Sequence, residues 1–139
     1  QWLEQMLKQP YHDFDAFLKA CKVRARSRVV VLRKAQDDAR NDFGLKTSGE
    51  ILRFIANGGL EQLEFINSKL WENNPDPSRP VIVDGYEFVS RMKRGYVALM
   101  FNKVTGYWTI KSFHISDNAN LPFVDAFKKA GFISGGDNE

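Results

Sequence analysis

Two runs of alternating large side chains, at residues 95–102 and 107–116, flank a turn-like segment and restrict the fold more than any other feature. The stretch is GYVALMFNKVTGYWTIKSFHIS. Alternation with a period of two, interrupted by a short segment that contains glycine, is the pattern of a β-hairpin. Residues 103–106 predict a four-residue turn with Gly106 in the left-handed conformation. The fold must therefore accommodate an antiparallel pair of strands at this position.

The turn also predicts which side chains share a face of the hairpin. The expected pairs are Phe101 with Trp108, Leu99 with Ile110, and Val97 with Ser112. Ser112 and His114 then continue the core face, which carries Val97, Leu99, Phe101, Trp108 and Ile110. The opposite face is mixed, with Tyr96, Ala98, Met100, Asn102, Tyr107, Thr109, Lys111 and Phe113. Either a helix or a substrate is expected to cover that mixed face.

Helical spacing of apolar side chains dominates the first half of the chain. The helices that this spacing predicts cover residues 12–22, 48–57, 60–71 and, near the end of the chain, 120–130. Thr47 and Glu50 form a capping box before the second helix, and Gly58 ends it. The stretch 23–44 is ambiguous, because its valines at 29–31 fit a short strand. A helix is favoured there, since the helical period continues through Ala35, Ala39 and Phe43 to Gly44.

The pattern changes after Pro80, where β-branched and aromatic residues alternate with turn signals at Asp84-Gly85 and at residues 102–106. The fold class is therefore expected to be α+β, with N-terminal helices followed by an antiparallel sheet and a short C-terminal helix. One domain over residues 1–139 is expected, with a helical half of about 1–74 and a sheet half of about 80–139.

Composition and missing motifs exclude several classes of protein. No apolar run approaches the roughly 20 residues that span a bilayer, so membrane insertion is not expected. Cys21 is the only cysteine, which rules out an internal disulfide. The chain lacks a phosphate-binding glycine loop, a dinucleotide fingerprint and an HExxH motif, and has few histidines. We therefore expect neither a metal nor a cofactor. The start at Gln1 suggests a C-terminal domain cut from a longer protein.

Positive charge is concentrated in one segment, although the formal net charge is only +3. Seven basic residues and no acid lie between positions 19 and 34: Lys19, Lys22, Arg24, Arg26, Arg28, Arg33 and Lys34. Such a cluster attracts polyanions. The candidate RNA-binding residues are Arg24, Arg26, Arg28, Arg33, Lys34, Lys93 and Arg94. The alternative is a solvated helix face whose charges are balanced by Asp37 and Asp38 or by a partner protein.

His114 and Lys111, at the polar end of the hairpin, are the first candidates for chemistry. A neutral imidazole at a strand end can act as general acid or base near pH 7, or can simply be a surface residue. Lys111, on the same face as Tyr107 and Thr109, can hold a phosphate, or can be an edge charge that limits aggregation. In the expected register the Lys111 and His114 side chains leave opposite faces of the hairpin.

Other polar residues near the hairpin have weaker roles in this hypothesis. Ser112 lacks the glycines and the acidic partner that frame a nucleophilic serine. Arg91, Lys93 and Arg94 precede the hairpin and either add positive charge at its open end or form a solvated turn. His12 lies before the first helix, where it can cap the helix or be unconstrained; its other role would be a second imidazole for acid–base catalysis.

The order of elements, the basic N-terminal half and the final hairpin YVALMFNKVTGYWTIKSFH resemble the BECR superfamily (barnase, EndoU, colicin and RelE-like) of bacterial and phage ribonuclease toxins. The resemblance covers roughly residues 10–116 and implies metal-independent cleavage of RNA, commonly transfer RNA. It implies His114 as the acid or base, and Lys111 and Arg91 as phosphate clamps. Thr109, Ser112 and Tyr107 would donate hydrogen bonds to the substrate. The chain lacks the HxxE-like pair of several members.

The same resemblance implies a secreted or phage-delivered toxin that acts in the bacterial cytoplasm and is neutralised by a cognate immunity or antitoxin protein. Two other functions remain open. One is a non-catalytic protein-binding module that uses the mixed hairpin face, because exposed aromatic and methionine side chains often mark interfaces. The other is an immunity or antitoxin protein whose basic segment docks on a partner or on nucleic acid.

Overall fold

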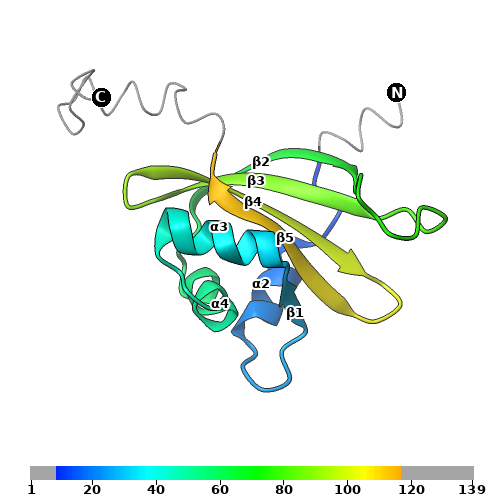
Figure 1. Cartoon of the computed structure of the whole chain (residues 1–139), viewed down its shortest axis with the longest axis horizontal. Helices are drawn as coiled ribbons and strands as arrows, with labels where there is room; N and C mark the ends of the chain where they lie inside the picture. The colour runs from blue at the N-terminus through cyan, green and yellow to red at the C-terminus, as the bar shows by residue number, and fades with distance from the viewer. Residues whose placement is uncertain (1–8, 117–139) are drawn as a thin grey trace.

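Within residues 9–116, three helices lie against one face of a five-stranded sheet whose strand order is β1-β5-β4-β3-β2 (Figure 1). A computed structural model describes residues 9–116, so the helix expected at 120–130 lies outside the described residues. The elements are α2 (Phe14–Lys22), β1 (Val29–Val31), α3 (Arg33–Phe43), α4 (Ser48–Ala56), β2 (Glu61–Leu70), β3 (Ile82–Ser90), β4 (Lys93–Asn102) and β5 (Tyr107–Ile115). The α+β class is confirmed. The sheet is mixed rather than antiparallel, because β1 runs parallel to β5.

The helix favoured over residues 23–44 is wrong in its first part, where the valines form β1. Val29 pairs with Trp108 and Val31 with Ile110, and the backbone N–H of Leu32 donates to the Ile110 carbonyl over 3.1 Å. The partner strand lies almost 80 residues away, so no local pattern reveals the pairing. The helix begins only at Arg33, and its end at Gly44, with φ of +70°, is as expected.

The helix predicted over residues 60–71 is also wrong, because this segment forms β2 at an edge of the sheet. Phe65 is half-buried against the core, whereas Ile66 and Leu70 are exposed. The pairing of β2 with β3 shifts twice, and Gln62 has a positive φ of 49°. Such irregularities break the period of two, so the apolar residues of β2 fall at helical spacing by coincidence.

The first and third helices follow their sequence signals. Thr47 Oγ1 accepts a 3.1 Å hydrogen bond from the Glu50 backbone N–H, which is half of the expected capping box. The Glu50 carboxylate reaches back to the backbone N–H of Lys46, over 2.8 Å, instead of to that of Thr47. The helices bury Phe17, Ala39, Phe43, Ile51 and Ile55 against the sheet, where they meet Phe88 and Phe113. Residues 9–116 contain no helix that is long and apolar enough to cross a membrane.

Asp84 and Gly85 do not form a turn, as their sequence suggested, but lie in the middle of β3. The fully buried Asp84 carboxylate accepts hydrogen bonds from the backbone N–H groups of Tyr11 and His12, over 3.1 and 2.7 Å, and from the Ser68 hydroxyl. His12 Nε2 lies 2.7 Å from the Ile82 carbonyl oxygen. Asp84 and His12 therefore fix the segment that leads into α2, and the His12 ring pairs with β3 rather than with the start of the helix.

Candidate active site on the open face of the sheet

An extra residue in β5 determines which side chains reach the face of the sheet opposite the helices. Phe101 pairs with Trp108 and Leu99 with Ile110, as expected, but Ala98 then pairs with Ser112 and Val97 with Phe113. Lys111 is therefore the additional residue of a β-bulge. The expected pair of Val97 with Ser112 and the opposite placement of Lys111 and His114 are both wrong.

The bulge reverses the direction of the side chains that follow it. Phe113, expected on the mixed face, is fully buried in the core. Ser112 and His114, expected on the core face, instead line the same two cavities as Lys111. One strand thus presents an ammonium, a hydroxyl and an imidazole to one region of the surface.

The first of these cavities is a groove of about 340 Å³ on the open face of the sheet. Its lining includes Asn67 and Lys69 from β2, Val83 and Glu87 from β3, Tyr96 and Ala98 from β4, and Lys111, Ser112 and His114 from β5. Ser116, directly after β5, also lines it. Four adjacent strands contribute, so the sheet itself fixes the spacing of these groups.

Glu87 lines this groove although only 4% of its surface is exposed. The Ser116 hydroxyl donates a 2.6 Å hydrogen bond to Glu87 Oε2, and Arg94 Nε lies 3.2 Å from Glu87 Oε1. Arg94 also lies 3.9 Å from the exposed Glu64. A buried carboxylate needs such partners, because desolvation strongly disfavours an uncompensated charge.

His114 stands directly opposite Tyr96 across β4 and β5, with ring centroids 5.3 Å apart and ring planes at 31°. His114 Nδ1 lies 2.7 Å from the Ile115 carbonyl oxygen. A carbonyl only accepts, so Nδ1 carries the proton in the neutral ring, and Nε2 is the nitrogen that can exchange a proton with a ligand. Gly85 underlies Tyr96, because a Cβ at position 85 would collide with the tyrosine hydroxyl.

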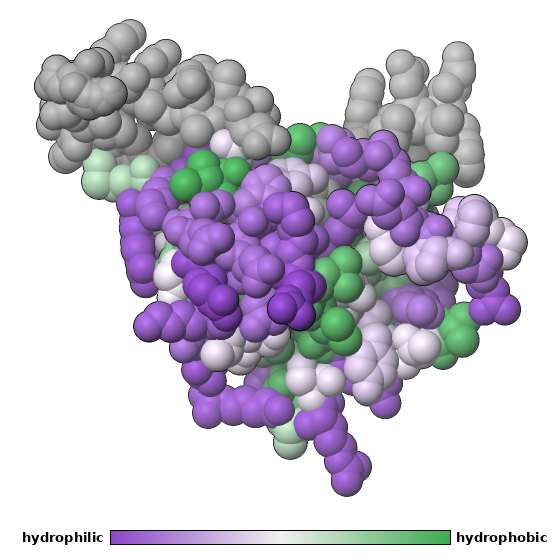
Figure 2. Space-filling view, viewed as in Figure 1, coloured by the Kyte–Doolittle hydropathy of each residue, from purple (hydrophilic) through white to green (hydrophobic). Residues whose placement is uncertain are grey.

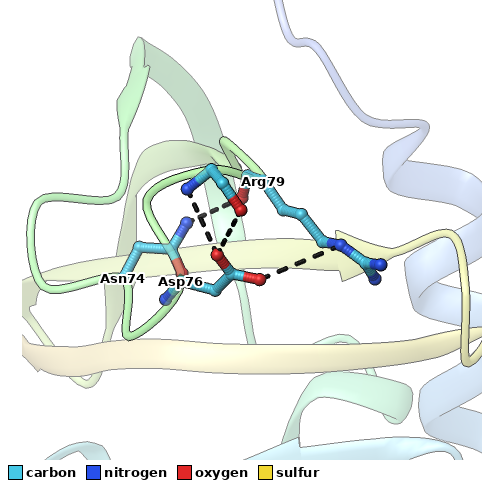
Figure 3. A network of polar contacts seen from close by, with 4 residues as sticks. Asn74, Asp76 and Arg79 are labelled. Carbon is cyan, nitrogen blue, oxygen red and sulfur yellow. Dashed lines mark hydrogen bonds and ion pairs between the residues drawn. The ribbon is translucent and has the colours of Figure 1, made fainter.

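A second cavity, of about 380 Å³, adjoins the groove and shares Asn73, Lys111, Ser112 and His114 with it. Leu32, Lys34, Asp38 and Trp71 complete its lining. The loop that carries Trp71 and Asn73 is held by a polar network (Figure 3). Asn74 Nδ2 donates to the Arg79 carbonyl over 2.8 Å, the Asp76 backbone N–H donates to Asn74 Oδ1 over 2.9 Å, and Arg79 Nε lies 3.8 Å from Asp76.

Three of the predicted site residues lie away from the groove. Thr109 pairs with Met100 nearer the hairpin turn, and Tyr107 is exposed beside that turn, with the Arg28 guanidinium 5.5 Å from its ring. Arg91 lies in the two-residue turn between β3 and β4, with a positive φ of 53°. None of these side chains lines either cavity.

The predicted RNA-binding residues are spread over several elements. Arg24, Arg26 and Arg28 lie exposed in the loop between α2 and β1, and Arg33 and Lys34 are exposed in the first turn of α3. Figure 2 shows that the side of the molecule that carries α3 is mostly hydrophilic.

Three of the predicted RNA-binding residues, Lys34, Lys93 and Arg94, already have partners within the chain. The Asp38 carboxylate accepts a 2.9 Å bond from Lys34 and raises the pKa of that lysine, as the alternative interpretation of the basic segment expects. Lys93 donates to the Asp42 carbonyl over 2.6 Å. Arg94 belongs to the Glu87 pair.

Sequence reasoning missed Glu87, Ser116, Asn73 and Trp71 as site residues. A signal was present for Glu87, because the strand VIVDGYEFVS carries two carboxylates within an apolar run. One of them, Asp84, anchors the N-terminal segment, and the other faces the groove. Trp71 and Asn73 carried no signal, since they reach the site from a loop.

Comparison of the chain with protein-family models, with curated proteins and with solved structures found no match. Residues 9–116 contain no group of three or more histidine, cysteine, aspartate or glutamate side chains able to hold a metal ion. The lining of the groove combines two carboxylates, two ammonium groups and an imidazole, from Glu72, Glu87, Lys69, Lys111 and His114. Such a set can transfer protons and stabilise a phosphate in one place.

Proposed function

We propose that this chain is a metal-independent endoribonuclease whose active site is the groove on the open face of the sheet. The observation that carries the proposal is the bulge at Lys111. It directs Lys111, Ser112 and His114 toward the groove that Glu87 also lines. The arrangement supplies two groups that can exchange protons. It also supplies cations that can bind a phosphate.

In the proposed reaction the ribose 2′-oxygen attacks the adjacent phosphorus. The Glu87 carboxylate accepts the proton of the 2′-hydroxyl while the new P–O2′ bond forms. Protonated His114 donates its Nε2 proton to the 5′-oxygen as the P–O5′ bond breaks. The products are a 2′,3′-cyclic phosphate and a 5′-hydroxyl, and no oxidant or co-reactant is consumed.

The transition state carries more negative charge on the phosphoryl oxygens than the substrate does, and cations fixed in advance stabilise it. Lys111 provides an ammonium at the groove. Arg94 does not line the groove, but its guanidinium, on a side chain that is 17% exposed, holds the Glu87 carboxylate in place. Ser112 contributes a hydroxyl that can donate to a phosphate oxygen.

Total bacterial RNA incubated with the purified protein and excess chelator, followed by a sequencing gel, tests this function. We expect discrete fragments that end in cyclic phosphate. Lys111→Ala and His114→Ala should each lower the rate by about two orders of magnitude. Lys46→Ala is the matched control, because Lys46 is exposed and lines neither cavity. Intact RNA with the unmodified protein would overturn the proposal.

A protein-binding module is the second candidate. Ile66 and Leu70 are 38% and 59% exposed on the edge strand β2 and line the groove. Exposed apolar side chains on an edge strand favour contact with another protein. Under the nuclease proposal the same edge would serve a cognate immunity or antitoxin protein. Delivery by secretion or by a phage stays a prediction of the BECR resemblance.

A further inference from the structure

We propose that a separate cavity in the helical layer binds a small organic phosphate that carries an apolar group. The cavity, of about 590 Å³, lies between α2, α4 and the loop that leads into β1 (Figure 1). This volume falls within the range of roughly 300–1,000 Å³ that is usual for small-molecule sites. The groove lies on the other face of the sheet, so this inference is independent of RNA cleavage.

Three exposed cations line this cavity. Lys22 and Arg24 come from the end of α2 and the loop after it, and Arg53 comes from α4. Among the residues that the structure describes, the lining contains no carboxylate. Within residues 9–116 no ion pair neutralises these three side chains, whereas Lys34 of the same basic segment is paired with Asp38. A bound anion would relieve the mutual repulsion of the three cations.

The donors at this cavity favour a phosphate over a carboxylate. Each of Arg24 and Arg53 carries a planar fork of N–H donors, which can bind two phosphate oxygens at once. The Ser27 hydroxyl accepts from the backbone N–H of Val29 over 3.2 Å, so its own proton is available for a phosphate oxygen. A phosphate monoester carries about two negative charges near pH 7 and therefore matches the three cations better than a carboxylate does.

The interior of the cavity is apolar. Cys21 and Val29 are 4% and 7% exposed, and Leu52 and Ala56 are half-buried against the core. Burial raises the pKa of the Cys21 thiol to about 12, so the thiol stays neutral and offers apolar surface to a ligand. Inorganic phosphate would leave this surface in water, whereas the alkyl or aromatic group of a phosphate ester would cover it. The cavity therefore suits an amphipathic phosphate ester.

Isothermal titration calorimetry with hexyl phosphate tests the site. Inorganic phosphate and hexanol probe the charged and the apolar part separately. We expect hexyl phosphate to bind at least about 10-fold more tightly than either, because it alone uses both parts of the cavity. Proton–carbon NMR spectra should show shifts of the methyl signals of Val29, Leu52 and Ala56. The methyl signals of Val83 and Ala98, which line the groove, should not move.

Arg24→Gln and Arg53→Gln should each weaken hexyl phosphate binding by about 10-fold, because each removes charge-assisted hydrogen bonds to the phosphate. Both arginines are exposed, so the thermal unfolding temperature should be unchanged. Arg33→Gln is the matched control, since Arg33 belongs to the same basic segment, is exposed and lies outside the cavity lining.

Equal affinity for hexyl phosphate and inorganic phosphate would overturn the site, because charge alone would then account for binding. Binding that survives Arg24→Gln and Arg53→Gln but is lost in Lys111→Ala would place the phosphate in the groove and would also overturn it. So would the absence of hexyl phosphate binding, even if RNA is cleaved. Hexyl phosphate binding that depends on the two arginines, without RNA cleavage, would support this site and overturn only the nuclease proposal.

Discussion

Ser112 lies opposite Ala98, although the preceding pair across the same two strands joins Ile110 to Leu99. The residue between them, Lys111, has been added to β5 without a counterpart in β4. This single insertion places Phe113 in the core and turns Ser112 and His114 toward the groove. The bulge thus lets the strand carry Lys111 while Phe113 stays in the core and Ser112 and His114 face the groove.

Deletion of Lys111 should remove the bulge and keep the fold. Ile110 and Phe113 would remain core residues and Ser112 and His114 would remain on the open face, because alternation becomes regular. We expect the free energy of unfolding to stay within about 1 kcal/mol of the unmodified protein, since only a half-buried irregularity outside the hydrophobic core is lost. RNA cleavage should fall as in Lys111→Ala. Loss of cooperative thermal unfolding would show that the bulge is needed for the register.

Glu87→Gln should lower RNA cleavage by about two orders of magnitude, because an amide cannot accept the 2′-hydroxyl proton. The amide oxygen still accepts from Ser116, but Arg94 loses its buried counter-charge, so stability should fall by about 1–3 kcal/mol. Glu64→Gln is the control, since Glu64 also lies near Arg94 but has a side chain that is 65% exposed. Cleavage by Glu87→Gln at the unmodified rate would remove Glu87 from the mechanism.

The turn at Arg91 and Met92 offers a stabilising substitution. Both residues have a positive φ, 53° and 66°, a backbone conformation that costs free energy for residues other than glycine and asparagine. Replacement of the pair by Asn-Gly should stabilise the protein by about 1 kcal/mol, as measured by chemical denaturation. The same variant tests the predicted phosphate-clamp role of Arg91. Because Arg91 lies outside the groove, we expect cleavage to continue, and its loss would restore Arg91 to the site.

Stability should fall at alkaline pH. Burial raises the pKa of the Cys21 thiol from 9.0 to about 12, and burial together with Asp84 and Asp13 raises the pKa of Tyr86 from 10.0 to about 12. The folded state therefore keeps protons that the unfolded state releases. The contribution of these two groups to the free energy of unfolding is fully present below pH 9 and is lost as the pH rises toward 12. Denaturation at several pH values measures this, and Cys21→Ala should lessen the slope.

The sequence alone determined the features whose signals are local. The hairpin turn at 103–106, the Thr47 cap of α4 and the Gly44 end of α3 depend on residues a few positions apart, and each is present as expected. The α+β class followed from the change of hydrophobic period after Pro80. The importance of Lys111 and His114 was a hypothesis from residue type, and their common groove was not foreseen.

Tertiary structure decided the features that depend on distant partners or on an irregular register. β1 exists because β5 offers it a parallel edge, and β2 is a strand because its bulges fit β3 although its sequence has helical spacing. The bulge at Lys111 could not be found from alternation, since one added residue reverses every side chain after it. The sequence thus specified which chemical groups the chain carries. The pairing of β3, β4 and β5, with its bulge at Lys111, decided that Glu87, Lys111 and His114 line one groove.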